Sequence, residues 1–190
     1  MVITKVSNLV HIMGDIIRIL KHTKFYLPKI KKTKNLSIVI IGNGPSANEF
    51  LKKTYKEKCI DSMAMNFFGI DKMFFSVKPN YYCVADPNVF DSKEIPLYIN
   101  DKYELLLDSL AKVDWNMTIF IPSNFKNSKF SDDVRSLNFK ILKFNNTPLH
   151  SNGYFMNKIM DFGWGMTTPE SVIISAIIIA IKLKYKAQET

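Results

Sequence analysis

A short apolar run followed by a glycine-rich turn constrains the fold of this chain more than any other feature. Residues 36–41 are mostly apolar and β-branched, which is typical of a parallel strand that is buried on both faces. Gly42 and Gly44 allow a sharp turn and the close approach of a ligand. Ser46 and Glu49 have the spacing of a capping box, which predicts that a helix begins there and continues to about residue 56.

The predicted turn favours the binding of an anion. A strand that leads through glycines into a helix start leaves backbone N–H groups and the positive end of the helix dipole at one spot, and phosphate is the usual ligand of such a spot. The turn is neither a dinucleotide fingerprint nor a Walker loop, because Pro45 and Ser46 stand where those motifs need other residues. An ordinary strand–turn–helix connection is the alternative interpretation.

Most of the net charge of +9 lies at the N-terminus. Residues 1–34 contain eight lysines and arginines against one aspartate, so the rest of the chain is close to neutral. Nucleic-acid-binding proteins more often spread positive charge over a folded face with interleaved aromatic residues, so we expect no nucleic-acid partner.

Residues 2–22 carry apolar side chains at helical spacing, which predicts an amphipathic helix followed by a basic linker up to residue 34. The segment is too polar to span a bilayer, and no small-residue cleavage site follows it. We expect it either to lie on an anionic membrane surface or to pack on the domain. The expected organisation is therefore a basic helix and linker over 1–34 and a nucleotide-binding domain over 35–190.

The remainder of the chain alternates between strands and helices. Pro122 closes one strand, and residues 145–166 are interpreted as a loop rich in Asn and Gly. Thr168 and Pro169 open a last helix, whose apolar body up to Leu183 predicts a buried core helix. Both cysteines, Cys59 and Cys83, are expected to be buried free thiols. Further strands are predicted over 62–66, 81–86, 117–121 and 139–144, and further helices over about 68–76 and 101–113.

This alternation predicts an α/β fold, namely a Rossmann-like parallel sheet flanked by helices and preceded by the N-terminal helix. Ligands of such sheets bind beyond the carboxyl ends of the strands. A polar side chain follows each of three successive apolar runs. Residues with hydroxyl groups also stand just before the last helix. Together they predict a nucleotide pocket, although Asn and Asp are also common turn residues. These side chains belong to Asn43, Asn66, Asp86, Thr168 and Ser171.

Four segments resemble glycosyltransferase family 42, the bacterial sialyltransferases, and the related MptE-like (6-hydroxymethylpterin diphosphokinase-like) domains. The resemblance covers about residues 36–186, with Asp86 standing where the sialyltransferases have Asn. The segments are Ile40-Ile41-Gly42-Asn43-Gly44-Pro45-Ser46, Met65-Asn66-Phe67-Phe68, residues 82–90 and residues 168–186, which end in Lys184-Tyr185-Lys186.

The resemblance implies a transferase that uses a CMP-linked sugar and a glycan acceptor in surface-polysaccharide synthesis. Asn43, Asn66 and Asp86 would hold the cytidine nucleotide, and Thr168 and Ser171 would line its phosphate side. A carboxylate near a phosphate is unfavourable unless it binds ribose hydroxyls or a cation. The expected location is the cytoplasm, and binding of residues 1–34 to a membrane surface would place the chain at the inner face of the membrane.

The catalytic residues stay unassigned, because the family's catalytic histidine and tyrosines follow the helix that ends near residue 186. On this basis the domain is expected to be incomplete at its C-terminus. His150 is the one candidate general base within the chain, and its alternative interpretation is a plain loop residue.

Two other functions stay open. A pterin pyrophosphokinase-like phosphotransferase would need Mg²⁺ and clustered carboxylates, and Asp132 and Asp133 stand in what is predicted to be a polar loop. A non-catalytic nucleotide-binding module is the third possibility. No metal site and no cofactor are predicted.

Overall fold

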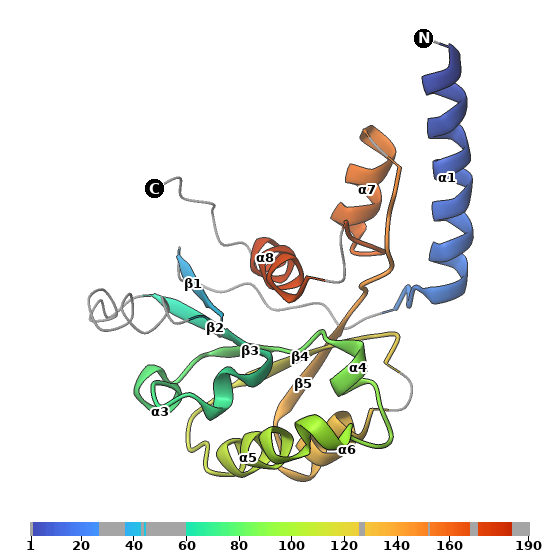
Figure 1. Ribbon diagram of the computed structural model, residues 1–190. Coiled ribbons are helices and arrows are strands. Elements are labelled where there is room, and N and C mark those ends of the chain that lie inside the picture. The colour runs from blue at the N-terminus through green and yellow to red at the C-terminus, as the bar shows by residue number, and fades with distance from the viewer. Residues whose placement is uncertain are drawn as a thin grey trace.

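Five strands form a parallel sheet in which each strand pairs with the next one along the chain (Figure 1). The computed structural model describes residues 2–26, 37–42, 44, 60–125, 128–151, 153–167 and 171–183. The strands are β1 (Ile38–Ile41), β2 (Asp61–Met65), β3 (Tyr81–Cys83), β4 (Thr118–Pro122) and β5 (Lys140–Phe144). The five predicted strands and the Rossmann-like α/β fold are therefore confirmed.

The strand order is sequential, β1-β2-β3-β4-β5, and all four pairings are parallel. The ends of neighbouring strands are in register, as when Met65 pairs with Cys83 and Pro122 with Phe144. All five carboxyl ends consequently lie at one edge of the sheet, which we call the carboxyl edge.

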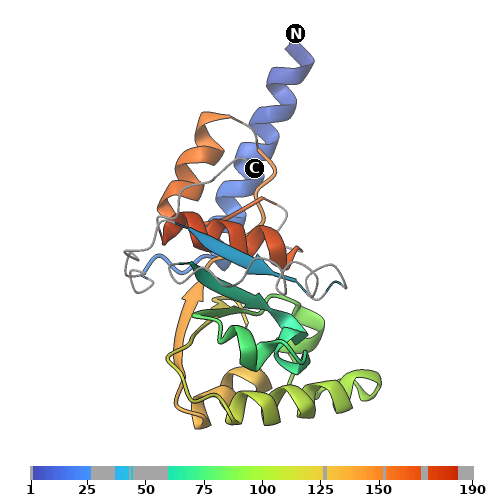
Figure 2. The same ribbon diagram turned by 90° about the vertical axis from the view of Figure 1, so that its left-hand side faces the viewer.

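Helices cover both faces of the sheet (Figure 2). Right-handed crossovers between strands in sequential order place the connecting helices on one face, and α3, α5 and α6 all lie there. α8 lies on the opposite face and packs against β1, β2 and β3. The elements outside the sheet are α1 (Val2–His22), η1 (Asn66–Ile70), α3 (Phe74–Val77), α4 (Pro87–Phe90), η2 (Leu97–Ile99), α5 (Asn100–Ala111), α6 (Lys129–Ser136), α7 (Tyr154–Phe162) and α8 (Val172–Lys182).

The alternation of side chains along each strand gives the sheet two apolar layers. On β3 and just after it, Tyr82 and Val84 join the core beneath α5, whereas Cys83 and Ala85 join the core beneath α8. Burial raises the pKa of the Cys83 thiol, which confirms the prediction of a buried free thiol there. Cys59 lies outside the described residues.

α8 is buried on one side only. Ser175, Ala176 and Ile179 face the sheet, whereas a stripe of isoleucines four residues apart is exposed, so the prediction of a wholly buried helix is wrong for this stripe. The N-cap of α8 is Ser171, so the predicted start at Thr168 is also wrong. The exposed residues are Ile173, Ile177 and Ile181.

Two segments that were interpreted as loops are helices. α7 stands inside residues 145–166, between Gly153 and Gly163, and Gly163 ends it in the left-handed conformation with φ of 75°. α6 contains Asp132 and Asp133, so these carboxylates do not lie in a polar loop. α6 buries Phe130 and Val134, and α7 buries Ile159. Both helices are short, and the surrounding Asn, Ser and Gly residues are typical of loops.

α1 stands beside α7 and is joined to the rest of the chain by polar contacts (Figures 1 and 2). The carboxylate of Asp15 accepts hydrogen bonds from the backbone N–H and the hydroxyl of Ser151, at 2.8 and 2.6 Å. Just after α1, the Asn145 side chain accepts from the backbone N–H of Lys24 at 3.0 Å and donates to its carbonyl at 2.9 Å. The predicted amphipathic helix is present, and its docked side combines the polar contacts of Asp15 with Ile19, which is buried against Leu149 and Ile159.

Candidate functional site

The predicted nucleotide-binding residues that the structure describes lie near the carboxyl edge. Gly42 follows β1, Asn66 follows β2, and Asp86 stands three residues after β3. Because these strands are neighbours in a parallel sheet, the three positions lie side by side along the edge.

Asn66 is held in a strained conformation by the end of β3. Its φ is 44°, in the left-handed region that Asn tolerates better than most residues. Its carbonyl accepts a hydrogen bond from the hydroxyl of Tyr82, and that hydroxyl accepts one from the backbone N–H of Gly69 at 2.9 Å. Burial raises the pKa of the Tyr82 phenol, so the hydroxyl stays protonated. It therefore donates a hydrogen bond to the Asn66 carbonyl.

The Asn66 side chain connects the ends of β2 and β3. Its Oδ1 accepts a hydrogen bond from the backbone N–H of Ala85 at 3.3 Å. Because Ala85 precedes Asp86, this bond places the Asn66 amide beside the start of α4.

Asp86 is the N-cap of α4. Its Oδ1 accepts from the backbone N–H of Asn88 at 3.0 Å, and Pro87 occupies the first helical position. Asn66 Nδ2 and Asp86 Oδ2 have no hydrogen-bond partner in the part of the chain that the structure describes. A donor and an acceptor are thus left available at neighbouring strand ends.

The glycine turn after β1 is described only in part. Gly42 has no positive φ, and a Cβ atom there would lie 3.5 Å from Met65 Cε, which is an ordinary contact. The structure therefore gives no reason for glycine at this position, and Gly44 is exposed. The residues Asn43, Pro45 and Ser46, with the predicted capping box and helix over 46–56, lie outside the described residues.

On the α8 side, Ser171 is the N-cap residue, and its hydroxyl makes no capping hydrogen bond. Its carbonyl accepts from the backbone N–H of Ser175 at 3.2 Å. Thr168, the other predicted phosphate ligand, lies outside the described residues.

His150 has a structural contact. Its backbone N–H donates to both carboxylate oxygens of Asp15 at 3.0 Å, and its side chain is exposed. This contact belongs to the attachment of α1, which agrees with the alternative interpretation of His150 as a loop residue.

The predicted phosphotransferase carboxylates are already paired. Asp132 accepts from Arg135 at 3.0 Å, and Asp133 accepts from Lys129 at 2.7 Å and from the Tyr103 hydroxyl at 2.7 Å. Over the described ranges, no group of three or more His, Cys, Asp or Glu side chains is placed to hold a metal ion.

A basic pocket that no sequence pattern predicts lies farther along the carboxyl edge. Its volume is about 330 Å³, and its walls come from the segment after α4, the start of α6 and the end of β5. A signal was present for α6, because Ser128 is a good N-cap residue and Phe130 and Val134 follow at helical spacing. The lining residues are Lys93, Phe125, Ser128, Lys129, Ser131, Asp132, Arg135 and Lys143.

No family model, curated protein or solved structure matches the chain. The functional assignment therefore depends on the fold and on the side chains at the carboxyl edge. None of the helices that the structure describes is long and apolar enough to cross a membrane.

Proposed function

We propose that the chain binds a nucleotide sugar at the carboxyl ends of β1, β2 and β3 and acts in glycosyl transfer to a surface glycan. One observation carries the proposal: Asn66 Oδ1 accepts from the N–H of Ala85, next to Asp86, and over the described residues neither Asn66 Nδ2 nor Asp86 Oδ2 has a hydrogen-bond partner. An amide and a carboxylate are suited to base edges and ribose hydroxyls.

A CMP-linked sugar is the favoured donor, because the segments around Gly42, Asn66 and Asp86 resemble the sialyltransferase motifs. Asp86 would accept from the ribose hydroxyls, a role that a carboxylate fills without facing the phosphate. Asn43 is proposed to hold the cytidine nucleotide together with Asn66 and Asp86. Thr168 and Ser171 are proposed to line its phosphate side, next to the turn that contains Pro45 and Ser46.

Neither alternative has a specific observation in its favour. A phosphotransferase needs carboxylates free to hold Mg²⁺, whereas Asp132 and Asp133 are both ion-paired. A non-catalytic module would bind the same nucleotide without turnover.

Calorimetric titration with CMP, CDP, UDP, GDP and ATP, with and without Mg²⁺, tests the proposal. We expect selective binding of CMP that is lost in Asn66→Gly, because glycine keeps the positive φ and removes the side chain. Asn157→Ala, an exposed asparagine of α7, is the matched control and should bind as the native chain does.

Asp86→Asn is a second variant, since it keeps the capping oxygen and removes the charge. Reduced CMP affinity with an unchanged unfolding midpoint is expected. A folded native chain that binds none of the five nucleotides would contradict the proposal, and binding of ATP only with Mg²⁺ would favour the phosphotransferase instead.

We also propose that α1 attaches the chain to an anionic membrane surface at the inner face of the cytoplasmic membrane. The supporting observation is a stripe of six large apolar side chains on the side of α1 opposite Asp15 and Ile19, with exposed fractions up to 70% at Leu20. Lys21 and Lys24 are exposed just beyond the stripe and can reach lipid phosphates. The six residues, called the α1 stripe below, are Leu9, Val10, Met13, Ile16, Ile17 and Leu20.

A further inference from the structure

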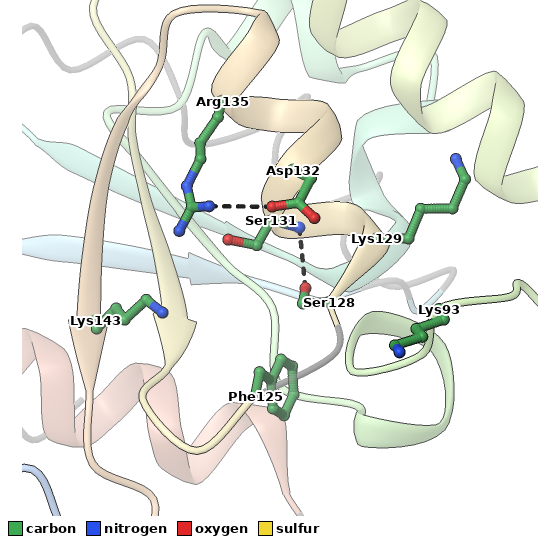
Figure 3. A pocket seen from close by; sticks show the side chains of 8 residues that line it. All are labelled: Lys93, Phe125, Ser128, Lys129, Ser131, Asp132, Arg135 and Lys143. Atoms are coloured by element: carbon green, nitrogen blue, oxygen red, sulfur yellow. Dashed lines mark hydrogen bonds and ion pairs between the residues drawn. The ribbon is translucent and has the colours of Figure 1, made fainter.

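Four cationic side chains line the basic pocket, and only two of them are paired with described carboxylates. Arg135 is paired with Asp132, and Lys129 with Asp133. Lys93 and Lys143 form no ion pair with any residue that the structure describes. Figure 3 shows these side chains around the space between α6, β5 and the segment after α4.

Other positive charges act on Lys143 in this pocket. Burial lowers its pKa, and the nearby charges of Lys24 and Arg135 lower it further, against the opposing effect of Asp132 and Asp91. Cations that repel one another in a partly buried site are stabilised when an anion is bound among them.

Ser131 provides an independent observation. It is 5% exposed, lines the pocket, and its hydroxyl has no hydrogen-bond partner within the described part of the chain. Its backbone N–H is already used, since it donates to the Ser128 hydroxyl at 2.9 Å. In Figure 3 the Ser131 side chain points from α6 toward the side where Arg135 and Lys143 lie. Buried hydroxyls almost always have a partner, so this one is left to bond with water or with a ligand in the pocket.

We propose that this pocket binds the phosphate group of a phosphorylated small molecule. Lysine, arginine and hydroxyl side chains line one space, and phosphate oxygens accept from all three kinds of donor. The volume of about 330 Å³ is more than a phosphate group needs, and Phe125 offers an apolar wall, so the ligand carries an organic part. Neither Asn66 nor Asp86 lines this pocket, and the assignment does not depend on the proposed nucleotide site.

Calorimetric titration of the full chain with inorganic phosphate, glucose 6-phosphate and glucose tests this assignment. We expect both phosphate compounds to bind and glucose not to bind. Lys143→Gln should weaken phosphate binding about tenfold or more, since a charge-assisted bond is lost. The control Lys140→Gln changes an exposed lysine at the other end of β5 and should have no effect.

The variant Ser131→Ala tests whether the Ser131 hydroxyl contacts the ligand or stabilises the fold. We expect phosphate binding to weaken roughly threefold, while the unliganded chain keeps its stability, because the hydroxyl has no partner to lose. The control Ser136→Ala removes a hydroxyl of the same helix that donates to the Asp133 carbonyl at 2.6 Å, and it should not change phosphate binding.

The pocket and the nucleotide site are tested separately. Asn66→Gly should leave the binding of phosphate and glucose 6-phosphate unchanged, even if it abolishes the binding of CMP. The pocket assignment is overturned if neither phosphate compound binds the native chain, if Lys140→Gln weakens binding as much as Lys143→Gln, or if Lys143→Gln abolishes CMP binding.

Discussion

Asp15 shows how one carboxylate decides which side of a helix is docked. It is fully buried, and its oxygens accept from Ser151, from the backbone N–H of His150 and from Arg18. Burial alone would raise the pKa of Asp15, but these hydrogen bonds and the Arg18 charge outweigh it and lower the pKa below 3.8. The side of α1 that carries Asp15 and the buried Ile19 is therefore the attached side, and the α1 stripe is left exposed.

Replacing Asp15 by alanine should destabilise the fold by about 1.5–3 kcal/mol at neutral pH, since two backbone N–H groups lose a charged acceptor. The lowered pKa sets the sign of the pH dependence. The contribution is present above pH 3.8 and is lost as the pH falls through the still lower pKa of the folded state. Urea unfolding at neutral pH and at about pH 3 measures this. Asp114→Ala, which removes an exposed carboxylate paired with Lys78, is the control. If Asp15→Ala lowered the free energy of unfolding equally at both pH values, the ionised carboxylate would not be the source of this stability.

Tyr82→Phe should destabilise the chain by about 1–3 kcal/mol, because the Gly69 N–H and the Asn66 carbonyl both lose their partner. The variant should also weaken nucleotide binding, since the tyrosine holds the turn that positions Asn66. Denaturant unfolding and CMP titration measure the two effects, with the exposed Tyr98→Phe as control. Unchanged stability would show that the Tyr82 hydroxyl does not support this turn.

At the scale of elements, α1 and α8 both expose apolar stripes, and among the described residues exposed lysines directly follow the stripe of α1 but not that of α8. On α8, the last turn contains Lys182, and burial lowers the pKa of that lysine. A membrane surface is therefore better matched to α1 than to α8.

Sedimentation with lipid vesicles tests the role of the α1 stripe. We expect the native chain to bind phosphatidylcholine vesicles that contain phosphatidylserine, and to bind more weakly at higher salt. Ile17→Asp should reduce this binding, whereas Leu97→Asp, at a leucine that is 95% exposed outside α1, should not. A native chain that stays in the supernatant with anionic vesicles would refute the proposal.

At the scale of the whole molecule, the strands were predictable because each is an apolar run that ends at Gly, Pro, Asn or Asp. The strand order was not predictable, since it depends on packing between layers rather than on any local signal. The basic pocket was hidden for a similar reason. Lys93, Ser131 and Lys143 come from three separate segments, and each one alone has the sequence of a solvated surface.

The sequential strand order also determines what can form while the chain is being synthesised. Each strand pairs with the one that left the ribosome just before it, so no strand waits for a distant partner. α8 differs, because it follows all five strands and yet packs across the first three. Until α8 arrives, Met63, Cys83 and Phe120 stay on an open apolar face. A nascent chain with a finished sheet and no α8 is therefore the species most in need of a chaperone.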